Sequence, residues 1–142
     1  MKEIVLQTKI KVCSYNELSA DDREVVDAAR AATGNSYAVY SKFNVGAAVR
    51  LKNGAIVKGS NQENAAYPSG LCAERTTLFW ANSQYPDSAV LTLAIAARTE
   101  KGELPVPIPP CGACRQVILD TEKRFGKTIK IILYGAKESY IF

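Results

Sequence analysis

An apolar run over residues 89–97 constrains the fold of this chain more than any other segment. Thr92 is the one polar residue in the run, which carries no charge. A strand that is apolar at nearly every position has no face left for solvent, so the run predicts a central strand covered on both sides. The run is too short to cross a bilayer, and we expect no membrane partner.

A helix is expected before this strand, over residues 20–33. Ser19 with Asp22 three residues later resembles a capping box, and apolar residues then recur at helical spacing until Gly34. A second helix is expected over residues 71–81.

Two strands are expected between these helices, over residues 44–51 and 55–61. They flank Asn53-Gly54, a dipeptide that readily adopts the positive φ angles of a type I′ turn. This arrangement predicts an antiparallel hairpin.

The last part of the chain fixes the fold class. The central strand is followed by a helix over residues 112–124 and a strand over residues 128–134. A strand, a helix and a strand in that order imply a parallel pair with a right-handed crossover. The sequence therefore predicts an α/β protein, a three-layer α/β/α sandwich with a mixed sheet.

Composition excludes several classes of protein. The 142 residues are 47% apolar and contain no repeat or linker, which predicts a single domain with its own core. The formal charge of +4 is mild and not clustered, so no nucleic-acid partner is expected. The N-terminus lacks the apolar core of a signal peptide, which indicates a cytoplasmic protein with reduced thiols.

Four cysteines and no histidine direct attention to metal chemistry. Cys111 and Cys114 form a C-x-x-C unit at an expected helix start, and Cys72 lies at another. Helix N-termini favour thiolates, the form that binds metal. Three ligands leave one position of a zinc ion open, as in catalytic sites. Cys13 has no partner at metal-binding spacing and is expected to take no part.

Three polar residues adjoin these cysteines in sequence. Glu74 follows Cys72 by two residues, about 200° around a helix, so it is poorly placed to bind the same ion and suits a general acid-base. Three thiolates give the zinc site a net negative charge. Arg75 and Gln116 are therefore expected to donate hydrogen bonds to the sulfurs.

Four segments together resemble a known family. They are residues 40–48 (YSKFNVGAA), 61–68 (NQENAAYP), 72–76 (CAERT) and 110–116 (PCGACRQ). A cysteine two residues before a glutamate, followed later by Pro-Cys-x-x-Cys, is typical of zinc deaminases. The combination is similar to the small homotetrameric cytidine deaminases, and the resemblance covers residues 20–134.

The resemblance implies both the cofactor and the reaction. Cys72, Cys111 and Cys114 would hold one Zn²⁺ per chain, and Glu74 would be the proton shuttle. Zinc-bound hydroxide would attack C4 of the base, Glu74 would protonate the amino nitrogen, and ammonia would leave. Cytidine and 2′-deoxycytidine would become uridine and 2′-deoxyuridine in pyrimidine salvage.

The resemblance also implies residues that bind the nucleoside. Asn61 and Glu63 would hold a ribose hydroxyl, and Phe43 would pack against the nucleoside. The backbone around Ala73 would contact the pyrimidine. Tyr67 would approach the site of a neighbouring subunit in a homotetramer.

Both ends of the chain depart from the family's pattern. Residues 1–18 form an N-terminal extension before a single deaminase domain at 19–142, and we expect an added edge strand from the apolar runs at 4–6 and 10–12. The family normally continues past a strand like 139–142 into a Leu-Leu-Pro segment whose aromatic residue covers the base. We therefore expect either a shortened chain or another cover for the site.

Three alternatives remain at this point. A zinc deaminase for another aminopyrimidine, such as blasticidin S, would share the zinc ligands, although Asn61 and Glu63 favour an ordinary ribose. A polynucleotide deaminase would typically use histidine as its first ligand and a basic groove. A non-catalytic zinc module, or a redox protein using Cys111 and Cys114, would need no substrate site.

Overall fold

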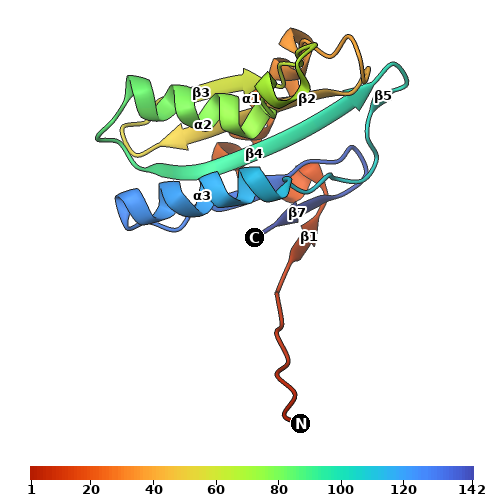
Figure 1. The fold of residues 1–142 in the computed structure, drawn as a ribbon. Coiled ribbons are helices and arrows are strands. Elements are labelled where there is room, and N and C mark those ends of the chain that lie inside the picture. The colour runs from red at the N-terminus through yellow and green to blue at the C-terminus, as the bar shows by residue number, and fades with distance from the viewer.

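A mixed sheet forms the middle layer of the computed structural model, which describes residues 1–142 (Figure 1). Its strands are β1 (Lys11–Cys13), β2 (Asn44–Leu51), β3 (Ile56–Ser60), β4 (Val90–Thr99), β5 (Gly102–Glu103), β6 (Lys130–Leu133) and β7 (Ser139–Ile141). The helices are α1 (Ala20–Ala32), α2 (Ala73–Gln84) and α3 (Gly112–Phe125), and three 3-10 turns lie at Tyr15–Glu17, Thr33–Asn35 and Tyr67–Ser69. The strand order is β1-β7-β6-β4-β2-β3, and β5 pairs with the end of β4.

The sheet is built around β4, as the apolar run predicts. β4 pairs antiparallel with β2 and parallel with β6, and α3 lies between β4 and β6 in the chain. Parallel neighbours require a crossover, which α3 supplies. The register pairs Ala47 with Ile95 on one side of β4 and Ile95 with Leu133 on the other.

Helices cover both faces of this sheet, which makes the fold the expected α/β/α sandwich. Ala94 and Ala96 of β4 belong to a buried cluster on the α1 face. Leu93 and Ile95 point the other way, into a cluster that includes Ile118 of α3. Figure 1 shows α2 and α3 in front of the sheet, on the same side. The alternation along β4 thus builds two cores from one strand.

The hairpin between β2 and β3 is present, but the expected type I′ turn is wrong. Gly54 alone in the turn has a positive φ, 90°, whereas a type I′ turn needs two such residues. Gly54 N–H donates to Leu51 O at 2.9 Å, and Asn53 Oδ1 accepts from Ala55 N–H at 3.0 Å. The side chain of Asn53 therefore holds the turn, and its backbone need not adopt a positive φ.

At the start of α1, only one of the two hydrogen bonds of the expected capping box is present. Ser19 Oγ accepts from Asp22 N–H at 3.1 Å. The Asp22 carboxylate does not return a bond to Ser19, because it pairs with Lys130 Nζ at 2.5 Å. This ion pair links α1 to β6.

The N-terminal segment adds one strand to the sheet. β1 pairs antiparallel with β7, so Val12 lies opposite Tyr140 at the edge of the sheet. Residues 4–6 form no strand and are exposed, and Figure 1 shows the first ten residues running away from the body. Of the two apolar runs, the one nearer the domain forms the edge strand. No helix has the length and apolar character that a membrane crossing requires.

Candidate zinc centre and active-site cleft

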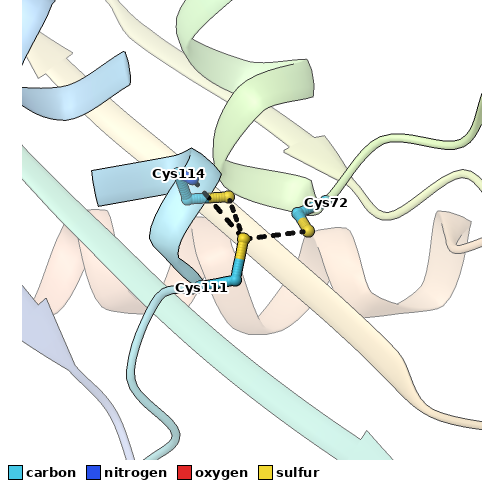
Figure 2. A group of neighbouring side chains, drawn as sticks. All are labelled: Cys72, Cys111 and Cys114. Carbon is cyan, nitrogen blue, oxygen red and sulfur yellow. Dashed lines mark hydrogen bonds between the residues drawn. The ribbon is translucent and has the colours of Figure 1, made fainter. Parts of the chain in front are cut away.

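The three predicted metal ligands meet between the starts of two helices. Cys72 is the N-cap of α2, Cys111 is the N-cap of α3, and Cys114 lies in the first turn of α3. Cys111 Sγ lies 3.8 Å from Cys72 Sγ and 3.4 Å from Cys114 Sγ, and all three sulfurs lie within 4.8 Å of one another (Figure 2). Residues 39 positions apart in the chain thus form one cluster.

This cluster fits a zinc ion. Zinc holds thiolate sulfurs at about 2.3 Å in a tetrahedron, which places neighbouring sulfurs about 3.8 Å apart. The measured separations are close to that spacing, with no side chain needing to move far. Cys114 is completely buried whereas Cys111 is exposed, so the open side of the cluster faces outward.

The local electrostatics also favour a bound cation. A hydrogen bond from Cys114 N–H lowers the pKa of the Cys111 thiol. Burial raises the pKa of Cys114, and the nearby carboxylate of Glu74 acts in the same direction. A thiolate at Cys114 therefore requires a positive charge beside it, which a metal ion supplies.

Of the two residues predicted to support the sulfurs, only Arg75 reaches one. Arg75 Nη2 donates to Cys72 Sγ at 3.7 Å, and its buried Nε has no partner. Gln116 is exposed, makes no hydrogen bond to a sulfur, and lines a groove between α2 and α3 beside Phe79. Gln116 follows Cys114 by two residues within α3, so the helix turns its side chain away from the cluster.

Glu74 lies beside the sulfurs and outside their cluster. Glu74 is 4% exposed, and its carboxylate is near enough to raise the pKa of the Cys114 thiol. Burial raises the pKa of this carboxyl above its ordinary value. The helix was expected to begin at residue 71, but it begins at Ala73, and Cys72 is its extended N-cap. The side chains of Cys72 and Glu74 thus point in different directions because Cys72 is an extended N-cap, and not because both residues lie in one helix about 200° apart.

A cleft of about 810 Å³ opens beside the three sulfurs. This volume lies within the range of small-molecule sites. Every residue that the resemblance assigns to nucleoside binding lines it, together with Glu74: these are Phe43, Asn61, Glu63, Tyr67 and Ala73. Tyr67 is 92% exposed at the rim, and Ala73 is fully buried at the base.

The amide of Asn61 is already engaged by the backbone that enters β2. Asn61 Oδ1 accepts from Val45 N–H at 2.9 Å, and Asn61 Nδ2 donates to Phe43 O at 2.9 Å. The side chain therefore joins the end of β3 to the residue that is expected to pack against the nucleoside. An amide offers two donor hydrogens and two lone pairs, so one of each remains for a ligand.

Glu63 holds the same loop from its other end. Glu63 Oε2 accepts from Tyr40 N–H at 2.8 Å and from Ser41 N–H at 3.3 Å. Hydrogen bonding from Ser41 is the largest of the effects that lower the pKa of the Glu63 carboxyl. Within this loop Lys42 has a φ of 59°, the one positive value outside glycine. Sequence reasoning placed Glu63 at the sugar and missed its part in shaping the loop.

Sequence reasoning also missed part of the cleft wall. Ile108 and Pro109 line the cleft next to Cys111, at the end of a proline-rich loop. The signal that could have indicated them is their position directly before the C-x-x-C unit. Cys13, which was expected to take no part, lies in β1 at the sheet edge and outside the sulfur cluster.

Comparisons with known proteins agree with this geometry. The family model described as the cytidine and deoxycytidylate deaminase zinc-binding region matches residues 19–129. A cytidine deaminase of Halalkalibacterium halodurans is 42% identical over 100 residues, covering 70% of this chain and 71% of that protein. A cytidine deaminase of Sporosarcina psychrophila is 43% identical over 100 residues, covering 70% and 69%.

Solved structures give the same result. The cytidine deaminase of Burkholderia pseudomallei has a TM-score of 0.66 at 35% identity, covering 83% of this chain and 86% of that one. The cytidine deaminase of Mycobacterium leprae has a TM-score of 0.64 at 31% identity, covering 87% and 94%. The matched residues 19–129 contain all three clustered cysteines and Glu74. The chain therefore belongs to the zinc-binding cytidine and deoxycytidylate deaminase family.

Proposed function

We propose that this protein is a zinc-dependent cytidine deaminase. It hydrolyses the amino group of cytidine and 2′-deoxycytidine, forming uridine, 2′-deoxyuridine and ammonia. The observation that carries the proposal is the shared cleft, which brings a three-sulfur metal site and the buried carboxylate of Glu74 to one face. A non-catalytic zinc module or a redox protein would need no such cleft.

Zinc is the cofactor, and Cys72, Cys111 and Cys114 hold it. Bound zinc supplies the Lewis acidity that makes water a competent nucleophile at neutral pH. Arg75 donates to the Cys72 sulfur and so offsets part of the negative charge of three thiolates.

Glu74 carries the proton through the reaction. Its carboxylate accepts a proton from the attacking water and delivers it to the departing amino nitrogen of the pyrimidine. Glu74 is almost fully buried beside Cys114, so its carboxylate exchanges protons with the substrate more readily than with bulk solvent. Such a positioned group contributes about 10²–10⁴-fold to rate.

The cleft residues orient the nucleoside. Phe43 packs against it, and the backbone at Ala73 contacts the pyrimidine. The free Oε1 of Glu63 and the remaining amide hydrogen of Asn61 are available to a ribose hydroxyl. Tyr67, exposed at the rim, approaches the site of a neighbouring subunit in a homotetramer.

The chain has two parts, a deaminase domain and an N-terminal extension, and it acts in one compartment of the cell. Residues 19–142 form the deaminase domain, and residues 1–18 are an extension that contributes the edge strand β1. The protein acts in the cytoplasm, in pyrimidine salvage. Cys72, Cys111 and Cys114 must stay reduced to bind zinc, which suits a reducing compartment.

A direct assay tests the proposal. Zinc-loaded protein should contain about one zinc per chain and convert cytidine to uridine, followed by the change in ultraviolet absorbance. Glu74→Gln should keep its zinc and lose about 10²–10⁴-fold in turnover. Cys111→Ala should lose zinc, whereas Cys13→Ala should retain it. Zinc-loaded protein without turnover of cytidine, or near-normal turnover by Glu74→Gln, would contradict the assignment.

A further inference from the structure

One wall of the cleft is formed by the segment that joins β5 to α3. Residues 104–110, here called the proline loop, contain four prolines and end directly before Cys111. Ile108 and Pro109 of this loop line the cleft beside Cys111. The position of the proline loop therefore sets both a cleft wall and the approach of one metal ligand.

The proline loop rests on the turn between β6 and β7. Ala136 N–H donates to Leu104 O at 2.8 Å, and Lys137 N–H donates to Pro105 O at 3.0 Å. Proline has no N–H, so a loop rich in proline is held mainly through its carbonyl groups. The turn supplies the donors that the loop lacks.

Gly135 lies against the proline loop with no room for a side chain. A Cβ at this residue would lie 2.7 Å from Pro105 O, 2.9 Å from Pro107 N and 2.6 Å from Glu138 O. All three are backbone atoms, which cannot rotate aside as a side chain can. The φ of Gly135 is not positive, so space and not backbone conformation requires glycine here.

Both ends of the proline loop are held separately. Arg30 Nε donates to Glu103 Oε1 at 2.7 Å, and Tyr134 O–H donates to Glu103 Oε2 at 3.0 Å, directly before the loop. Arg115 Nε donates at 3.0 Å to the carbonyl of Pro110, the last residue of the loop. A side chain added at Gly135 would therefore displace the middle of the loop, which carries the cleft-lining residue Ile108.

We propose that Gly135, outside the cleft, is a positioning residue for deamination: together with the anchor at Glu103 it seats the proline loop and thereby sets the cleft wall and Cys111. The inference rests on the proposed deaminase function for its kinetic consequence. Its consequence for zinc does not depend on the substrate. Gly135 lines no part of the cleft and touches no ligand, so it acts only through the loop.

Gly135→Ala is the direct test, with Gly34→Ala as its matched control. An added Cβ at Gly34 meets nothing within 4 Å, and its φ is not positive. Gly135→Ala should reduce kcat/KM for cytidine by about tenfold to a hundredfold, mainly through KM, since small displacements far from the chemistry have effects of this size. It should also release zinc faster to a coloured chelator. Gly34→Ala should match wild type in both measurements.

Two further variants separate positioning from loss of stability. Ile132→Val alters a fully buried residue on β6 that packs on the α1 face, so it should lower Tm without changing KM or zinc release. Glu103→Gln keeps Gly135 and weakens the loop's first anchor, so it should raise KM and speed zinc release. This variant still tests the inference if Gly135→Ala does not fold.

The outcomes distinguish this inference from the proposed function. If wild-type protein fails to deaminate cytidine, the proposed function fails while the zinc-release comparison still tests the loop. If folded Gly135→Ala changes Tm alone, with wild-type KM and zinc release, the inference is overturned. It is also overturned if Ile132→Val shifts KM and zinc release as much as Gly135→Ala at equal loss of Tm, or if Glu103→Gln leaves both readouts unchanged.

Discussion

Replacing Asn61 by alanine should weaken the fold and the substrate site together. The change leaves Val45 N–H and Phe43 O without their partner. Val45 is only 8% exposed, and an unsatisfied buried group of this kind costs about 1–3 kcal/mol. Phe43 is half-buried, so water can replace part of the second bond. We therefore expect a total loss of about 2–3 kcal/mol, which lowers Tm by roughly 6–10 °C in a domain of this size.

Kinetic measurements then distinguish two roles of Asn61, holding the loop that carries Phe43 and binding a ribose hydroxyl. The comparison uses cytidine and analogues that each lack one ribose hydroxyl. Displacement of Phe43 should reduce kcat/KM for every substrate in Asn61→Ala, because in the proposed site each nucleoside packs against that ring. A direct bond to one hydroxyl should add a further loss that disappears with the analogue lacking it.

Asn61→Asp separates the donor role of Asn61 from its acceptor role. Aspartate keeps an acceptor for Val45 N–H but replaces the donor that faces Phe43 O with a second oxygen. It should bind cytidine as poorly as Asn61→Ala does. An Asn61→Ala protein with unchanged Tm, and with losses confined to substrates carrying one particular hydroxyl, would refute the reasoning that Asn61 holds the loop.

Two further predictions follow from charged contacts. Arg75→Ala should weaken zinc binding by about 10–100-fold in a chelator competition, whereas Gln116→Ala should not, because of these two side chains only that of Arg75 donates to a ligand sulfur. Equal effects of the two variants would contradict this assignment. The hydrogen bond from Arg30 is the largest effect that lowers the pKa of the Glu103 carboxyl. The pair therefore stabilises the folded protein at pH values above the ordinary carboxyl pKa. This stabilisation is lost as the pH falls through the lowered pKa of Glu103. Thermal unfolding across acid pH should show a flatter decline for Glu103→Gln than for wild type; identical slopes would contradict the link.

The elements of the fold could be predicted because each has a local cause. The apolar run at 89–97 becomes β4, in the middle of the sheet, because a strand without a polar face must be covered twice. The helix at 112–124 becomes α3, with Cys111 at its N-cap. The turn at Asn53 was assigned the wrong type, because dipeptide preference does not reveal that a side-chain hydrogen bond will hold the loop.

Site residues could be predicted where the chemistry is unusual and the spacing short. Cysteines at positions 72, 111 and 114 suggest a metal in any fold that brings two helix starts together. Arg75 and Gln116 looked equivalent in sequence, as each lies two or three residues from a ligand. Only Arg75 reaches a sulfur, because the phase of each helix and the packing of α2 against α3 decide which side chains face the cluster.

By itself the sequence determined which chemistry is available, namely three thiolates without histidine and one carboxylate beside them. It also determined the fold class, a sheet with helices on both faces. The tertiary structure alone decided how the cleft is assembled. Asn61 and Glu63 proved to hold the loop that carries Phe43, and Gly135 proved to lie against the loop that leads to Cys111. The physical reason is that ligand identity is a property of single residues, whereas backbone approach and hydrogen-bond partners depend on segments that meet only when the chain folds.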